Sequence, residues 1–312
     1  MTSPTNPARS SPTRPTPTRS DWLAGARPRT LPAAVVPVVV GAGCAVGAAS
    51  SVGDGIDATV WWRVAGALAV SLLLQVGVNY ANDYSDGVRG TDDVRVGPMR
   101  LVASGTASPR AVKSAALATF ALAGVIGLVL AVATSWWLLA VGAAAIAAAW
   151  GYTGGPKPYG YLGLGEAFVF VFFGLVATVG STYLAIESVP AVTWVAAAGV
   201  GFLACSLLVV NNLRDIPTDR EVGKRTLAVR LGDAATRRLY VALIGAAFAC
   251  VLVSMIWRTW AFAGLIAVVA AIQPARLVLG GARGPALIPV LGGTGRAQMV
   301  YGLSFAIGLA LG

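Results

Sequence analysis

The amino-acid sequence predicts an all-α, polytopic membrane protein with about nine transmembrane helices, and three observations lead to this fold class. Hydrophobic residues make up 56% of the 312 residues and charged residues only 12%, whereas a soluble domain usually carries about a quarter charged residues. Several apolar runs, such as "TLPAAVVPVVVGAGCAVGAA" from Thr30, reach the roughly 20 residues that a helix needs to cross a bilayer. These runs are too many for one signal peptide, and the basic residues are concentrated in alternate connecting segments.

Nine predicted helices follow from the apolar windows between polar breaks. Their expected ranges are 31–50, 62–81, 112–132, 136–152, 164–185, 191–211, 238–256, 259–278 and 297–311. The preceding residues 1–26 are rich in Pro, Ser, Thr and Arg and have little apolar surface to bury, so they are predicted to form a disordered tail. The transmembrane domain is therefore expected to span residues 27–312.

The distribution of charge predicts an orientation in the membrane. If the N-terminus is cytoplasmic, every one of the 23 Lys and Arg residues except Arg63 and Arg258 falls in a cytoplasmic segment, as the positive-inside rule requires. The net charge of +10 is then explained by topology, and no nucleic-acid partner is expected. Seven tryptophans fall at the predicted outer ends, where the membrane interface favours them: Trp61, Trp62, Trp136, Trp137, Trp194, Trp257 and Trp260. We expect a multi-pass protein of the cell (plasma) membrane with its C-terminus outside.

Acidic residues concentrate in two clusters, both on the predicted cytoplasmic side. "NYANDYSDGVRGTDD" follows the predicted helix 62–81, and "NNLRDIPTDREVGKR" follows the predicted helix 191–211. Residues three and four apart share a helix face, so each cluster can present a row of oxygen atoms. Rows of carboxylates repel one another unless cations lie between them, and Mg²⁺ favours a few carboxylates together with substrate phosphate. Pro217 is expected to end the regular helix, which would leave Asp219 on a loop.

Basic residues follow both clusters and suggest a clamp for a diphosphate, because Arg and Lys donate to phosphate oxygens. The candidates are Arg95 and Arg100 after the first cluster, Lys224 and Arg225 after the second, and Lys157 between Pro156 and Pro158. A single acidic loop at a membrane surface is as often a solvated loop without a function as it is a functional site. Two such clusters together favour a function, because ionisable groups at a membrane are costly and usually functional. Tyr152 and Tyr159 can serve equally as interface anchors or as site residues, and Glu166 can serve simply to favour a helix N-terminus.

The motifs "NDYSD" and "DIPTD" resemble the two aspartate-rich motifs of the UbiA-type intramembrane prenyltransferases. The longer strings "RPRTLPAAVVPVVVG", "RVGPMRLVASG" and "NNLRDIPTDREVGKRTLAVRLG" are similar to the branch that prenylates 1,4-dihydroxy-2-naphthoate on the way to menaquinone. The resemblance extends over most of the chain from Arg27 onward. It implies helices around a central cavity, with Mg²⁺ and a polyprenyl diphosphate at the cytoplasmic mouth and a lateral opening to membrane lipid for the isoprenoid tail.

The resemblance also implies roles for individual residues. Catalysis and Mg²⁺ binding are expected of Asn82, Asp83, Asp86, Asp215 and Asp219, with Asp92 as a further metal ligand. Additional candidates for substrate binding are Asn79, Asn211, Asn212, Tyr152 and Tyr159. The implied reaction transfers a polyprenyl group to 1,4-dihydroxy-2-naphthoate with loss of CO₂ and diphosphate and gives demethylmenaquinol. The chain contains no histidine, so any proton would pass to an aspartate, a tyrosine, diphosphate or water.

Two alternatives remain open at the level of sequence. A secondary transporter of an organic anion would carry its polar groups near the bilayer midplane in broken helices, whereas here they gather at one interface. A prenyltransferase could instead act on hydroxybenzoate, homogentisate or a phosphorylated sugar or glycerol, and only the resemblance argues against those acceptors. Neither the prenyl chain length nor the oligomeric state follows from the sequence.

Overall fold

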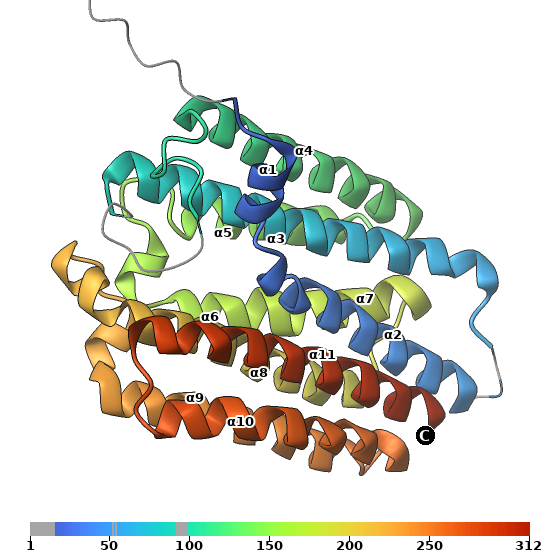
Figure 1. The fold of residues 1–312 in the computed structure, drawn as a ribbon. Helices are drawn as coiled ribbons and strands as arrows, with labels where there is room; N and C mark the ends of the chain where they lie inside the picture. The colour runs from blue at the N-terminus through green and yellow to red at the C-terminus, as the bar shows by residue number, and fades with distance from the viewer. Residues whose placement is uncertain (1–15, 52, 54, 92–98) are drawn as a thin grey trace, which may run out of the picture.

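The computed structural model describes residues 16–51, 53, 55–91 and 99–312, and these residues form helices and connecting segments without a β-strand. Most of the long helices run roughly along one common direction (Figure 1), so the molecule has two ends. The end at which α3 and α8 finish and α4 and α9 begin is called the site end. The α-helices are α1 Arg19–Gly25, α2 Pro32–Ser51, α3 Trp61–Arg89, α4 Pro109–Ala133, α5 Trp137–Gly151, α6 Gly165–Val169, α7 Ala177–Ile186, α8 Ala191–Glu221, α9 Leu227–Ser254, α10 Ala267–Leu279 and α11 Ile288–Leu311.

Every predicted membrane window coincides with helical structure. A π-helical segment, Phe170–Val176, joins α6 to α7 into one continuous helix, and a 3-10 segment, Thr259–Ile266, leads into α10. Among the described residues, seven helices are long and apolar enough to cross a membrane. The apolar helix α5 has 15 residues and is shorter than these seven. The all-helical fold class is confirmed, and the count of nine membrane-crossing helices stays a prediction.

The predicted ends of the two helices that carry the acidic clusters are wrong, and so is the expectation that Asp219 lies on a loop. Helix α3 continues to Arg89 rather than ending near residue 81, and it ends where Gly90 adopts the left-handed φ of 70° that glycine tolerates. Helix α8 continues to Glu221, with Pro217 inside it. A proline removes one backbone donor, but the last turn still bonds normally, because Val222 N donates to Thr218 O at 3.2 Å. The helical register therefore extends through both motifs.

The described part of the predicted disordered tail, residues 16–26, contains ordered structure. Residues 19–25 form the short helix α1, which begins at a capping box between Thr18 and Asp21. Trp22 packs edge-to-face on Tyr80 of α3 with ring centroids 5.6 Å apart, and the Tyr80 hydroxyl donates to Trp22 O at 2.9 Å. An aromatic pair with a satisfied hydroxyl is enough to hold this short segment against α3.

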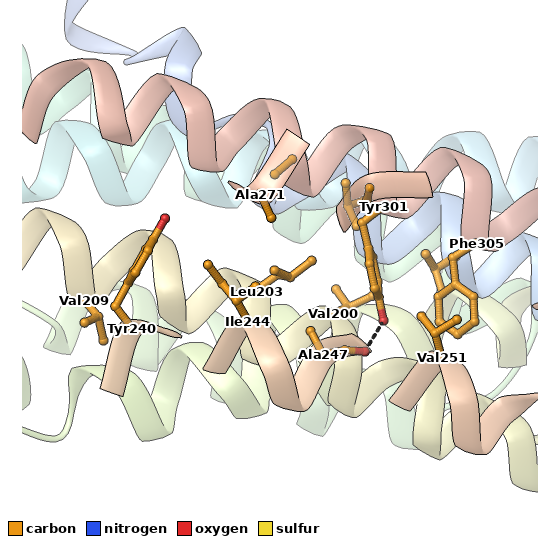
Figure 2. Close-up of a cluster of buried hydrophobic side chains, with 14 of the residues drawn as sticks. Val200, Leu203, Val209, Tyr240, Ile244, Ala247, Val251, Ala271, Tyr301 and Phe305 are labelled. Carbon is orange, nitrogen blue, oxygen red and sulfur yellow. Dashed lines mark hydrogen bonds between the residues drawn. The ribbon is translucent and has the colours of Figure 1, made fainter. Parts of the chain in front are cut away.

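The main hydrophobic core lies among α2, α8, α9, α10 and α11 (Figure 2). Tyr301 and Phe305 of α11 are fully buried there, and the Tyr301 hydroxyl donates to Ala247 O of α9 at 3.1 Å. Helices α2 and α11 approach closely because Gly43 has no side chain, since a Cβ at this position would lie 2.5 Å from Ala306 O. This packing fixes the position of α8, which carries the second motif.

The seven tryptophans predicted to mark an interface lie on the segments at the end opposite the site end. Their exposed fractions run from 42% for Trp61 to 64% for Trp136. Exposed tryptophan at one level of an apolar bundle is typical of the boundary between lipid and water. The bundle is therefore chemically polarised, with exposed tryptophans at one end and the charged motifs at the other.

Candidate functional site

A cavity of about 740 Å³ begins between the site ends of α3 and α8 and extends along the bundle. Three kinds of side chain line it in order of depth. A charged mouth consists of Asp86, Arg100, Asp215, Asp219 and Lys224. Beneath it lies a polar belt of uncharged side chains, defined as Asn79, Asn82, Tyr152, Thr153 and Asn212. The deepest part is apolar and is lined by residues such as Val38, Leu130, Leu138 and Leu184.

Asp86 is the centre of the charged mouth. Its carboxylate accepts a hydrogen bond of 2.6 Å from the Tyr161 hydroxyl and lies 3.3 Å from Lys224 Nζ and 3.6 Å from an Arg100 guanidinium nitrogen. Only 4% of Asp86 is exposed, so these pairings are poorly screened by solvent. Burial and the neighbouring Asp86 carboxylate raise the pKa of Tyr161, which therefore keeps the proton that it donates.

Lys224 connects the mouth to a third segment of the chain. Its Nζ lies 4.7 Å from the centre of the Tyr161 ring, within the range of a cation–π interaction. The Tyr161 carbonyl oxygen accepts from the Arg225 backbone N–H at 3.0 Å, and the Asp219 carbonyl oxygen accepts from Lys224 N at 2.8 Å. The connection after α8 and the 3-10 helix Tyr159–Leu162 are thus held together at the mouth.

The second motif lies on the last turns of α8. Asp215 is 6% exposed and accepts two hydrogen bonds of 2.7 Å from the guanidinium of the adjacent Arg214. The same guanidinium donates to Asn211 Oδ1 at 2.9 Å. Asp219, two turns after Asn211, also lines the cavity. Because Arg forks match carboxylate geometry, Arg214 fixes the orientation of Asp215.

Asp83 occupies a different position from the other motif carboxylates. It does not line the cavity, and it is only 1% exposed. Its two carboxylate oxygens accept from the backbone N–H groups of Leu101, at 2.8 Å, and Val102, at 2.9 Å. In this structure Asp83 therefore anchors the segment that carries Arg100, and its predicted part in binding metal stays a prediction.

Hydrogen bonds fix most members of the polar belt. Asn82 accepts from the Thr153 hydroxyl at 2.7 Å, and Asn79 donates to Ala26 O at 2.8 Å. Asn212 donates to the buried Glu166 at 3.0 Å. Tyr159 packs edge-to-face against the belt residue Tyr152 and is itself held by donating to Ala148 O at 2.8 Å. The belt is a set of preoriented dipoles just inside the charged mouth.

Several predicted site residues lie away from the cavity or outside the described residues. Lys157 and Arg225 are exposed and do not line the cavity. Asp92 and Arg95 fall in the segment 92–98, outside the described residues. The remaining predicted residues, apart from Asp83, come together around the one cavity: Asn79, Asn82, Asp86, Arg100, Tyr152, Tyr159, Asn211, Asn212, Asp215, Asp219 and Lys224.

The sequence reasoning missed some residues of the site. Arg27, Thr153, Tyr161 and Arg214 all line the cavity. Arg214 sits inside the string "NNLRDIPTD", where its adjacency to Asp215 was the available signal. Tyr161 lies in the glycine-rich string "PYGYLG", and its distance from Asp86 in the sequence does not predict the contact between them.

The mouth offers oxygen ligands but no preformed metal cage. Among the described residues there is no close group of three or more His, Cys, Asp and Glu that could hold a metal ion. The carboxylates of Asp86, Asp215 and Asp219 nevertheless line the same cavity as the amides of Asn82 and Asn211. Magnesium commonly takes one or two carboxylates and completes its shell with water and substrate phosphate. The donor set fits a metal ion that arrives together with a phosphorylated ligand.

A membrane-length helical bundle with a charged mouth over an apolar cavity defines a class of protein that handles an amphiphilic ligand with an anionic head. The family model for the UbiA prenyltransferase family matches residues 34–284. The chain therefore belongs to the UbiA prenyltransferase family. It is a multi-pass membrane protein.

Two relatives illustrate the similarity in sequence. The 1,4-dihydroxy-2-naphthoate octaprenyltransferase of Mycobacterium tuberculosis is 52% identical over 293 residues, covering 94% of this chain and 98% of the relative. The Escherichia coli protein of the same name is 34% identical over 93% of this chain and 95% of its own.

Solved structures share the fold at low sequence identity. A digeranylgeranylglyceryl phosphate synthase matches with a TM-score of 0.61 at 15% identity, covering 93% of this chain and 98% of that one. A UbiA homologue from Archaeoglobus fulgidus, bound to GPP and Mg²⁺, matches with a TM-score of 0.56 at 17% identity. The match covers 92% of this chain and 99% of that one. These likenesses confirm the helical fold.

Proposed function

We propose that this protein transfers a polyprenyl group from a polyprenyl diphosphate to 1,4-dihydroxy-2-naphthoate, with release of diphosphate and CO₂, to give demethylmenaquinol. The observation that carries the proposal is one continuous cavity whose charged mouth suits a diphosphate and whose depth suits an isoprenoid chain. The acceptor is supported by the relatives at 52% and 34% identity, which are named for octaprenyl transfer to 1,4-dihydroxy-2-naphthoate.

The diphosphate binds at the charged mouth in this proposal. Arg100 and Lys224, both within 4 Å of Asp86, donate to its oxygens. Asn82, Asp86, Asn211, Asp215 and Asp219 are the residues that would hold Mg²⁺. The chemistry that Mg²⁺ supplies when bound is neutralisation of the negative charge that develops on the leaving diphosphate. Preplaced cations at the mouth contribute the same stabilisation, because they need no reorganisation as the bond breaks.

The transfer itself takes place at the boundary between the polar belt and the apolar depth. The allylic C–O bond breaks with its electron pair going to diphosphate, and the apolar walls keep water from the resulting carbocation. The carboxyl-bearing carbon of the electron-rich ring attacks and forms the new C–C bond. Loss of the carboxylate as CO₂ returns an electron pair to the ring, so aromaticity is restored without a separate base.

The proposed orientation places the charged mouth and the N-terminus on the cytoplasmic side of the plasma membrane. The basic segments that follow α3 and α8 support it. The exposed tryptophans at the opposite end support an outer interface there. Labelling of a cysteine introduced at Lys157 or at Trp136, in a variant whose three native cysteines are replaced by alanine and in sealed right-side-out vesicles, tests the orientation. A membrane-impermeant maleimide should react at Trp136→Cys and not at Lys157→Cys.

Product analysis tests the proposed reaction. Purified protein is incubated with Mg²⁺ and each combination of geranylgeranyl or octaprenyl diphosphate with dihydroxynaphthoate, hydroxybenzoate or homogentisate, and the products are identified by mass spectrometry. We expect a prenylated, decarboxylated naphthalenediol from dihydroxynaphthoate and little product from the other acceptors. Uptake of a labelled anion into proteoliposomes without any prenylated product would instead support a transporter.

A further inference from the structure

Glu166 is a buried acidic residue that the proposed reaction does not use. It lies in the first turn of α6 and is 9% exposed. One of its carboxyl oxygens accepts from Asn212 Nδ2 at 3.0 Å. Its other oxygen, Oε2, is buried and has no hydrogen-bond partner among the described residues. A buried acidic group that is only half satisfied is costly, so a leucine or methionine would serve better if only packing mattered.

The bond to Glu166 determines which way the Asn212 amide faces. Glu166 Oε1 accepts from Asn212 Nδ2, which holds the amide in the orientation in which its –NH₂ group points toward Glu166. The amide oxygen of Asn212 then points away from Glu166. Asn212 lines the cavity, and among the residues that the structure describes its side chain bonds only to Glu166, through the –NH₂ group.

The depth of Asn212 separates it from the diphosphate. It precedes Asp215 by three residues on α8, which places it roughly 4.5 Å further from the charged mouth at a helix rise of about 1.5 Å per residue. The next cavity residue along the same face is the apolar Leu208. A carbonyl oxygen repels phosphate oxygens, which offer no donor. What suits it at this depth is a hydroxyl group on a largely apolar ligand.

We propose that Glu166 is a positioning residue, which holds Asn212 so that its amide oxygen accepts a hydrogen bond from one ring hydroxyl of the aromatic acceptor. The inference rests on the proposed function, because it takes a hydroxylated naphthoate as the second substrate. It adds a specificity element that discriminates between aromatic acceptors by the position of a hydroxyl group. A site built to bond a hydroxyl strongly rejects the analogue that lacks it, because the site's own polar group is then left unpaired.

The test separates acceptor recognition from binding of the prenyl donor. Glu166→Met removes the group that orients Asn212, Asn212→Leu removes the acceptor oxygen, and Glu166→Gln keeps an oxygen that can accept from Asn212. Loss of one hydrogen bond should raise KM for dihydroxynaphthoate about tenfold in the first two variants. KM for geranylgeranyl diphosphate and the Mg²⁺ requirement should stay within about twofold, and Glu166→Gln should recover most of the loss. The double variant Glu166→Met with Asn212→Leu should be no worse than Asn212→Leu alone, because both act on one contact.

Two competitive inhibitors locate the hydroxyl that is contacted. With 1-hydroxy-2-naphthoate and 4-hydroxy-2-naphthoate as probes, Glu166→Met should weaken inhibition by one of them about tenfold and leave the other unchanged. Gln298→Met is the matched control. Gln298 is fully buried in α11, is outside the cavity, and has no side-chain hydrogen bond among the described residues. Gln298→Met should leave KM for both substrates and the inhibition constants of both probes unchanged.

Other outcomes overturn the inference. Equal increases in KM for donor and acceptor, additive effects in the double variant, or equal weakening of both inhibitors would give Glu166 only a structural role. If Glu166→Met does not yield folded protein, Asn212→Leu and Glu166→Gln with the two inhibitors decide the question. If wild-type protein forms no product from dihydroxynaphthoate, the proposed function is overturned and this inference with it. The wild-type assay comes first, so failure of the proposed function is told apart from failure of this inference before any variant is made.

Discussion

Lys224 Nζ lies 3.3 Å from Asp86 Oδ2, and this ion pair joins the end of α3 to the connection between α8 and α9. Both side chains are nearly buried, at 10% and 5% exposure. The Tyr161 hydroxyl approaches the other oxygen of the same carboxylate. The end of α3, the connection after α8 and the connection after α5 therefore meet at the Asp86 carboxylate. Removing its charge should weaken the contacts among these three segments.

Asp86→Asn should lower turnover by about two to three orders of magnitude, the usual cost of removing a preorganised electrostatic group. The substitution keeps the shape of the side chain but leaves Lys224 and Arg100 without their buried counter-charge. Steady-state rates with dihydroxynaphthoate and geranylgeranyl diphosphate measure the effect. Glu221→Gln is the control, since Glu221 is an exposed acid at the end of α8, just after the second motif, and lies outside the cavity. Near wild-type turnover of Asp86→Asn would remove Asp86 from the site.

Tyr161→Phe should lower kcat/KM about fivefold to tenfold, because it removes one hydrogen bond to a charged group and keeps the ring beneath Lys224. Because burial raises the pKa of Tyr161, the hydroxyl stays protonated, and the ratio of wild-type to variant rates should be constant between about pH 6 and 9. Tyr183→Phe, at the opposite end of the bundle, is the control. A ratio that falls steeply within this range would mean that Tyr161 loses its proton there.

Magnesium dependence should distinguish the carboxylates of the second motif from the cations beside them. Treatment with EDTA is expected to abolish product formation, and Mg²⁺ should restore it. Asp215→Asn should raise the Mg²⁺ concentration needed for half-maximal rate, because it removes a charged oxygen ligand. Arg214→Gln tests the orienting role of the bidentate pair, and it should raise the same concentration less. Undiminished activity in EDTA would exclude a divalent metal.

The depth of the cavity should limit the length of the prenyl donor. Gly142 of α5 and Gly180 of α7 line the cavity, and apart from the adjoining backbone of the same helix no described atom lies within 4 Å of the position that a Cβ would take at either residue. Counted from Gly151 at the site end of α5, Gly142 lies about 14 Å deep, and counted from Gly165 at the site end of the continuous helix α6–α7, Gly180 lies about 22 Å deep. Leucine at either position should lower kcat/KM for octaprenyl diphosphate relative to geranyl diphosphate, with the larger effect at Gly142.

The control for this series is Gly245→Leu. Gly245 also has open space around it, but it is exposed on α9 outside the cavity. It should leave the donor preference unchanged. Equal loss for long and short donors in Gly142→Leu would show that the chain does not pass this residue.

Helical spacing explains why much of the site could be predicted. Asn82 and Asp86, like Asn211, Asp215 and Asp219, repeat every four residues and therefore line one face, provided that the helices continue. They do continue, past Pro217 in α8 and as far as Gly90 in α3. The positions of the membrane helices could also be predicted, because a helix that crosses a bilayer needs a long apolar segment.

Contacts between distant segments could not be read in the same way. Asp83 and Asp86 are three residues apart on α3, so spacing alone could not tell which would face the cavity and which the backbone of Leu101. Arg214 was missed because neighbours on a helix point about 100° apart, yet its long side chain turns back onto Asp215. Lys157 lies between two prolines, which fix the local backbone but not the direction in which the loop faces.

Asp83 provides the sharpest separation of structural from chemical roles within the first motif. Its two oxygens accept from Leu101 N and Val102 N, immediately after Arg100. Asp83→Asn replaces one acceptor oxygen with a donor, so one buried backbone N–H loses its partner at a cost of about 1–3 kcal/mol. We expect a lower Tm and faster proteolysis of the loop after α3.

The Mg²⁺ concentration for half-maximal rate should remain at the wild-type value in Asp83→Asn, in contrast to Asp215→Asn. Any loss of activity should follow from misplacement of Arg100 and should appear mainly in KM for the prenyl diphosphate. Scanning fluorimetry together with a Mg²⁺ titration of activity measures both quantities on the same preparation. An unchanged Tm with a raised Mg²⁺ requirement would return Asp83 to the metal ligands, as its position in the motif first indicated.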